Sequence, residues 1–97
     1  ISSFIYRTDK ALDAARIMTF MQIMIRDHGN DLLRYKGILN ISGCDKRVIY
    51  QGVHMLLTED FGKPWKTEEI KESVMVFIGR NLPKEDMLEA LDSCRVK

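Results

Sequence analysis

The residues best suited to metal chemistry are two cysteines, Cys44 and Cys94, and two histidines, His28 and His54. Thiolate and imidazole groups are the ligands that zinc and related metals favour in proteins. No two of these residues have a metal-ligand spacing such as Cys-x-x-Cys. Cys44 and His54 nevertheless fall on one predicted hairpin, where they could approach each other. Direct metal binding by His54 and Cys44 therefore stays open as an alternative to an ordinary packing or interface role for His54.

A second polar cluster, Arg34-Tyr35-Lys36-Gly37, places two cations and an aromatic ring immediately before a predicted strand. Cations in this arrangement can pair with a phosphate, an acidic partner or another domain. The plain alternative is a solvated turn in which Gly37 only sets the backbone geometry. The spacing alone does not distinguish a binding role for these cations from a solvated turn.

Signatures of catalysis and of nucleotide binding are missing from the sequence. The six glycines form neither G-x-x-x-x-G-K-[ST] nor G-x-G-x-x-G, the turns in which backbone amides hold phosphates. There is also no G-x-S-x-G and no H-E-x-x-H segment. We therefore expect no catalytic residues and no bound nucleotide in this chain.

The composition indicates a single domain over residues 1–97, because 97 residues are too few for two cores. Fifteen basic and fourteen acidic residues balance, so no bulk charge favours nucleic acid or a membrane surface as a partner. No apolar run approaches the roughly 20 residues of a membrane-spanning helix. The two isolated cysteines suggest free thiols in the cytoplasm, although a 44–94 disulfide stays open. The start at Ile1, without a signal peptide, suggests a piece of a longer chain.

Hydrophobic periodicity predicts an α+β fold. The expected elements are a strand at 3–7, a helix at 11–27, a helical turn at 31–35, strands at 38–42 and 47–57, a charged loop at 58–73, a strand at 74–78 and a helix beginning within 81–85. The order β-α-β-β-β-α favours a two-layer sandwich with a mostly antiparallel four-stranded sheet and both helices on one face.

The sheet face away from the helices is expected to be apolar. In the predicted strand 47–57, both sets of alternate residues contain large apolar side chains, and we place Tyr50 and His54 on the uncovered side. An exposed apolar face of this size is typical of a docking surface. The alternative is that the loop at 58–73, which contains Trp65, folds back over it. Aromatic side chains on an open sheet could instead stack on RNA, but the neutral charge argues against this.

Three segments, 34–39, 50–54 and 76–82, together resemble the C-terminal domain of CobW-type GTPases, and the resemblance covers nearly the whole chain. The first carries the R-x-K-G strand entry, and the last is a hydrophobic strand that closes with Ile78-Gly79. Two features depart from the family pattern. Residues 8–11 replace a Pro-Phe pair found in many relatives, and a His-rich loop is missing.

The resemblance implies a longer protein with an N-terminal P-loop GTPase domain that binds GTP, Mg²⁺ and often Zn²⁺ or Co²⁺. Such proteins are thought to deliver metals to client proteins or to cofactors, including cobalamin precursors. The C-terminal domain would then contribute docking or regulation, with its own GTPase domain and a metal-receiving client as partners. We expect the interaction residues to be Arg34, Lys36, Tyr50 and His54, and the apolar face could also pair two copies.

Overall fold

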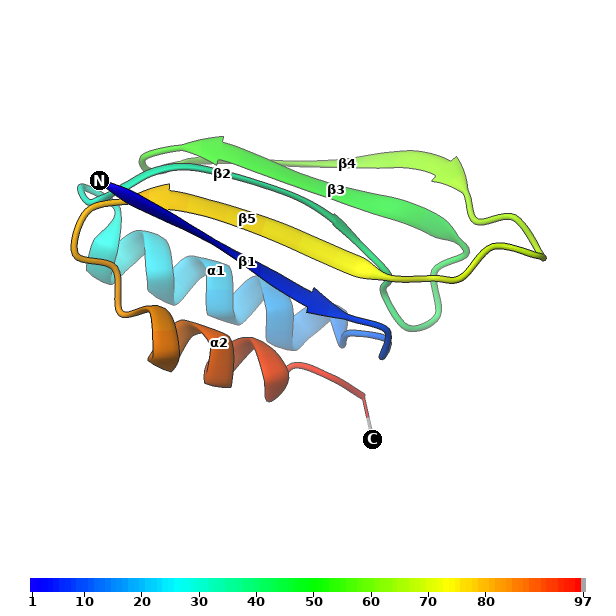
Figure 1. Cartoon of the computed structure of the whole chain (residues 1–97). Helices are drawn as coiled ribbons and strands as arrows, with labels where there is room; N and C mark the ends of the chain where they lie inside the picture. Colours follow the sequence, from blue (N-terminus) through cyan, green and yellow to red (C-terminus); the bar gives the residue numbers. More distant parts are fainter. Residues whose placement is uncertain (97) are drawn as a thin grey trace.

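The computed structural model describes residues 1–96 and places two helices against one face of a five-stranded sheet (Figure 1). The elements are β1 (Ser2–Thr8), α1 (Ala14–His28), β2 (Leu32–Leu39), β3 (Lys46–Val53), β4 (Leu56–Pro64), β5 (Ser73–Gly79) and α2 (Lys84–Asp92). The predicted α+β class and the position of both helices are confirmed. The sheet has five strands rather than four, and the element order is β-α-β-β-β-β-α.

The strands lie in the order β1-β5-β2-β3-β4, and every neighbouring pair is antiparallel. The apolar run predicted at 74–78 forms β5, which lies between β1 and β2. Met75 and Phe77 of this strand are fully buried against the helices, whereas the alternate residues Val74, Val76 and Ile78 are half-buried on the other face. β5 is hydrogen-bonded to a strand on each side, and helices cover one of its faces. A strand in this central position is typically apolar.

The strand missing from the prediction is β4. Residues 47–57 do not form one long strand, because the chain turns at His54-Met55 and returns with Val53 opposite Leu56. His54 adopts a left-handed conformation with φ 54°. The turn lacks the Asn-Gly or Asp-Gly pair that commonly marks a hairpin. The apolar residues on both sides of it therefore resembled one continuous strand, and the polar β4 resembled a loop.

The other boundary differences have local causes. α1 begins at Ala14 instead of residue 11, because the carboxylate of Asp13 accepts a hydrogen bond from the Arg16 backbone N–H at 3.0 Å. Leu12 precedes the helix and is fully buried. The helical turn predicted at 31–35 is wrong, because β2 begins at Leu32 and Tyr35 pairs with Phe77 of β5.

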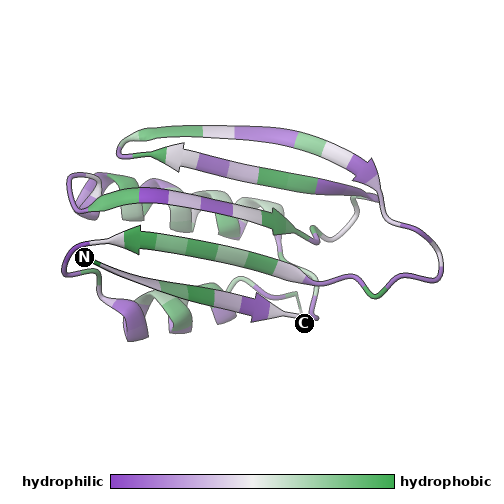
Figure 2. Cartoon of the chain, turned by 45° about the horizontal axis from the view of Figure 1, so that its top comes forward, coloured by the Kyte–Doolittle hydropathy of each residue, from purple (hydrophilic) through white to green (hydrophobic). Residues whose placement is uncertain are grey.

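An aromatic cluster forms the centre of the core between the sheet and the helices. The Phe4 and Phe77 rings stack with centroids 5.2 Å apart, and Phe20 of α1 approaches Phe77 edge-on at 6.4 Å. Figure 2 shows β5 as a largely hydrophobic strand between β1 and β2. Because Phe4, Tyr6 and Tyr50 are all buried, they are not available for stacking on RNA.

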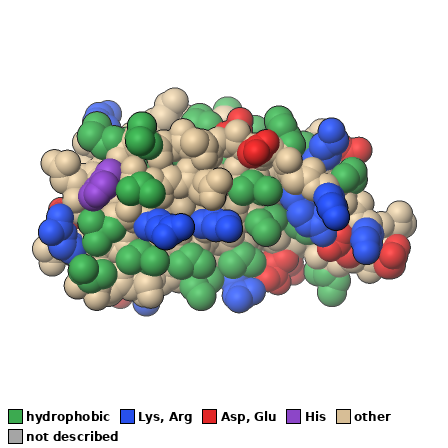
Figure 3. Space-filling view, turned by 90° about the horizontal axis from the view of Figure 1, so that it is seen from above, with side chains coloured by type: hydrophobic (Ala, Val, Ile, Leu, Met, Phe, Trp, Pro, Cys, Tyr) green, Lys and Arg blue, Asp and Glu red, His purple; other side chains and the backbone are tan. Residues whose placement is uncertain are grey.

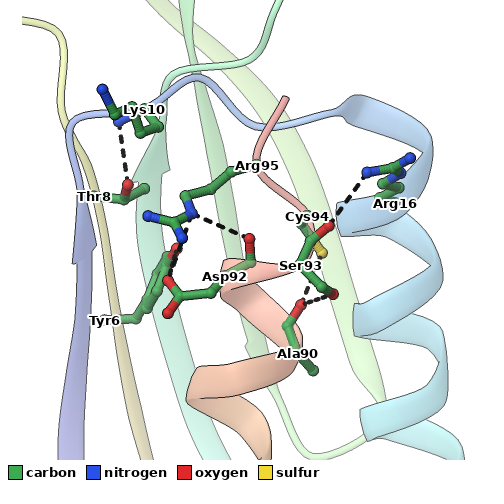
Figure 4. Close-up of polar contacts among 9 residues, drawn as sticks. All are labelled: Tyr6, Thr8, Lys10, Arg16, Ala90, Asp92, Ser93, Cys94 and Arg95. Carbon is green, nitrogen blue, oxygen red and sulfur yellow. Dashed lines mark hydrogen bonds and ion pairs between the residues drawn. The ribbon is translucent and has the colours of Figure 1, made fainter. Parts of the chain in front are cut away.

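A partly buried hydrogen bond connects the first strand to the last helix (Figure 4). The Tyr6 hydroxyl donates to the Asp92 carboxylate at 2.9 Å. Burial, together with this acceptor, raises the pKa of Tyr6 from 10.0 to about 12. The folded protein therefore keeps the Tyr6 proton over a pH range in which the unfolded chain loses it.

This shift predicts alkaline destabilisation. Below pH 10 the contribution of Tyr6 to the free energy of unfolding is complete, and it is lost as the pH rises from about 10 to about 12. Tyr6→Phe should unfold more easily than the wild type at pH 8 but lose about 1–2 kcal/mol less between pH 8 and pH 11.5. Urea titrations at both pH values measure this difference. Equal losses in the two proteins would show that Tyr6 does not couple to folding.

Both cysteines carry free thiols: Cys44 is half-buried, and Cys94 is buried at the end of α2. Burial raises the pKa of the Cys94 thiol. Among the residues described, no helix combines the length and the apolar character needed to cross a membrane.

Candidate interaction face

The sheet face opposite the helices, here called the outer face, carries alternate residues of all five strands. Its apolar side chains are substantially accessible: Ile5 is 51% exposed and Ile38 is 40% exposed. Figure 3 shows hydrophobic side chains over much of this face, with basic side chains across its centre. The apolar members are Ile5, Ile38, Ile49, Val53, Leu56, Val74, Val76 and Ile78.

Arg34 and Lys36 lie at the centre of the outer face, two residues apart on β2. Both are exposed, and Lys36 lies between Gln51 of β3 and Val76 of β5. Arg34 pairs in register with Ile78. Within residues 1–96, neither cation forms an ion pair. Two like charges without counter-ions therefore lie among apolar neighbours.

Two shallow hollows flank Lys36 on this face. One, of about 240 Å³, is lined by Arg34, Gln51, Val53, Leu56 and Thr58 as well as Lys36. The other, of about 380 Å³, lies toward the loop at 65–72. It is lined by apolar residues that include Ile38, Val74 and Val76, and at the loop end by Glu69 and Glu72. The arrangement provides a cation between two partly apolar depressions, which suits a partner that combines carboxylates with apolar side chains.

The loop at 65–72 covers only one end of the outer face. The Arg47 guanidinium lies 4.4 Å from the centre of the Trp65 ring and forms an ion pair with Glu69. The backbone N–H of Lys66, with the help of Arg47, holds the pKa of Glu69 below its usual range. This contact holds the loop beside β3, so the alternative of self-coverage applies only at that end, while Ile5 and Leu56 stay exposed.

The placement of Tyr50 on the uncovered side of the sheet is wrong. Tyr50 is only 2% exposed and points toward the helices together with Val48. Burial and the neighbouring Glu59 raise its pKa. The alternation in β3 was predicted correctly, but the sequence did not show which alternate set faced the helices. Ile49 and Gln51 take the outer positions instead.

Cys44 and His54 lie at opposite ends of β3, so they do not form a metal site. The strand between them has eight residues, a length of roughly 26 Å. The Cys44 thiol lies 3.5 Å from the backbone oxygen of Lys46, and His54 is exposed in the β3–β4 turn. Over residues 1–96, no three Cys, His, Asp or Glu side chains gather in a way that would hold a metal ion. The predicted pair therefore does not fit a metal.

A comparison against known families identifies the family of this chain. The model of the cobalamin synthesis protein cobW C-terminal domain matches residues 1–95, and this chain belongs to that family. The resemblance seen in the sequence is thereby confirmed.

The chain is similar to the zinc chaperone YjiA of Escherichia coli K12. The two are 37% identical over 95 residues, which is 98% of this chain and 30% of YjiA. The crystal structure of the Zn(II)-bound YjiA GTPase matches with a TM-score of 0.93 and 36% identity over the same shares of the two chains. A Zn(II)-bound triple mutant of YjiA matches equally well. The chain thus spans about 30% of the length of these relatives.

Proposed function

We propose that this domain is the docking part of a GTP-dependent zinc chaperone, acting in the cytoplasm. The observation that carries the proposal is the outer face, where Arg34 and Lys36 lack counter-ions among exposed apolar residues. Family membership and the similarity to a zinc chaperone support the wider role. The GTPase activity, with its GTP and Mg²⁺, would belong to a separate domain of the full-length protein, and this domain would contribute no catalytic residue.

The partner of the outer face would be the protein's own GTPase domain or a metal-receiving client. Either would need carboxylates opposite Arg34 and Lys36 and apolar groups beside them. Pairing of two copies through this face is less suitable, because it would bring the same cations of both copies together. The zinc role rests on the YjiA similarity, whereas a role in cobalamin synthesis is the second candidate, favoured by the family description.

Reversal of both central charges tests the docking role. We expect the Arg34→Glu/Lys36→Glu variant to bind a separately produced GTPase domain at least tenfold more weakly, because it removes attraction and adds like charge. His54→Ala should have a smaller effect, since His54 lies at the margin of the face. Isothermal titration calorimetry measures both.

Lys84→Glu on α2 is the control, because it reverses one exposed charge on the helical layer and so makes half the change in net charge of the double variant. It should leave the affinity within about twofold of the wild type. Unchanged binding of the double variant would exclude the outer face as the docking surface for this partner. A control that loses half or more of the binding free energy lost by the double variant would show a nonspecific dependence on net charge.

A further inference from the structure

The two edges of the sheet differ in how well they are protected against pairing with another strand. At the β4 edge, the Asp60 carboxylate accepts a hydrogen bond from the Phe61 backbone N–H at 2.8 Å. The Arg47 guanidinium donates hydrogen bonds to the backbone carbonyl oxygens of Lys63 and Pro64, at 3.0 Å each. The β3–β4 register also shifts near this end. A proline and an irregular register are among the devices by which natural sheets block an edge, and the side-chain bonds to the main chain occupy some of its free polar groups.

The β1 edge has none of these devices. Its seven residues pair with β5 in one unbroken register, and the strand contains neither glycine nor proline. Within residues 1–96, no other backbone segment hydrogen-bonds to Ser2–Thr8. Arg7, the one charged residue of β1, is paired with Glu72 at 2.9 Å. Every second residue of β1 therefore directs an unpaired N–H and C=O away from the sheet.

The sequence of β1 is suited to antiparallel pairing with itself. A two-fold axis at Ile5 would place the two Ile5 side chains opposite each other on the outer face. It would also place Phe4 opposite Tyr6 on the helical side and Ser3 opposite Arg7. No pair of like charges would meet, and the aromatic and aliphatic pairs are favourable cross-strand combinations.

We propose that β1 is a self-association site, at which two copies of this chain join their sheets edge to edge about Ile5. The outer face then continues across both copies and stays open to other partners. Figure 1 shows β1 at the edge of the sheet, with α2 beneath it. One strand pair buries less surface than a permanent dimer needs, so the dimer is reversible, with a dissociation constant of roughly micromolar or weaker.

Sedimentation equilibrium of the chain itself between about 10 μM and 1 mM tests the proposal. Wild type should show a concentration-dependent monomer–dimer equilibrium. Ile5→Lys and Ile5→Glu should each weaken dimerisation at least tenfold, because each places like charges at the axis. An equimolar mixture of the two variants should form a heterodimer, since opposite charges then meet. Ile38→Lys, a change at another exposed strand isoleucine, should leave the dimer unchanged.

A measurement on the wild type alone tests the proposal even if the variants do not fold. Hydrogen exchange of β1 amides should slow between 10 μM and 1 mM, while exchange in α1 should not change. A strictly monomeric chain, an unaltered dimer in Ile5→Lys, a mixture that fails to associate, or unchanged exchange in β1 would each overturn the proposal. None of these outcomes bears on docking through Arg34 and Lys36, which the GTPase-domain titration tests separately.

Discussion

Phe77→Ala should cost about 3–5 kcal/mol of the free energy of unfolding. Phe77 is fully buried in β5, stacked on Phe4 and in edge contact with Phe20. Removal of the ring leaves a cavity that adjoins both layers and removes both aromatic contacts. For a domain of this size, the melting temperature should fall by about 15 °C or more. Urea titration and thermal melts measure the two quantities.

Val76→Ala is the matched control, because Val76 is the neighbouring residue of the same strand but is only half-buried on the outer face. It should cost less than about 1.5 kcal/mol. If both changes cost the same, the aromatic cluster between the sheet and the helices does not dominate the core, and the assignment of the two faces is wrong.

Gly52→Ala should also be strongly destabilising, by about 3 kcal/mol or more. A Cβ at this position would overlap the Tyr35 hydroxyl and the Leu56 carbonyl oxygen. These two groups are themselves hydrogen-bonded at 3.3 Å, so neither can move without loss of that contact. Because Leu56 opens β4, we expect the β3–β4 hairpin to open first. Urea titration gives the total loss, and hydrogen exchange shows whether it is greatest in β4.

Gly62→Ala on β4 provides the comparison. A Cβ there would lie 3.2 Å from the Arg47 and Ile49 side chains, which can shift by a few tenths of an ångström. Its cost should stay below about 1 kcal/mol, since alanine also restricts the unfolded chain. A Gly52→Ala protein as stable as Gly62→Ala would contradict the close approach of Tyr35 beneath Gly52.

Periodicity predicted the elements that a single strong pattern specifies. The helix over Ala14–His28 repeats apolar residues every three or four positions, and β5 is an uninterrupted apolar run. β4 has no such pattern, because its residues after Leu56-Leu57 are mostly polar, as they can be in an edge strand with little covering over it. The turn at His54-Met55 has no turn signature in the sequence. Only the pairing of Val53 with Leu56 distinguishes it from a continuing strand.

The candidate site was predictable in part. The sequence placed Arg34 and Lys36 together beside a glycine, and the structure leaves both exposed on the outer face. Tyr50 was misplaced, because alternation gives two faces without saying which one the helices cover. The contact between Arg47 and Trp65 was missed. Its only signal was a lone tryptophan in a charged segment, and the two residues are brought together by the pairing of β3 with β4.

Docking through the outer face is tested most directly by an NMR footprint with labelled isoleucine methyl groups. Isoleucines lie on both layers: Ile5, Ile38, Ile49 and Ile78 on the outer face, and Ile17, Ile23 and Ile25 on α1. When an unlabelled GTPase domain is added, we predict shifts or broadening of the outer-face methyl signals, greatest at Ile38 and Ile78 beside the two cations. Perturbation confined to the α1 methyl groups, with the outer-face signals unchanged, would contradict the account.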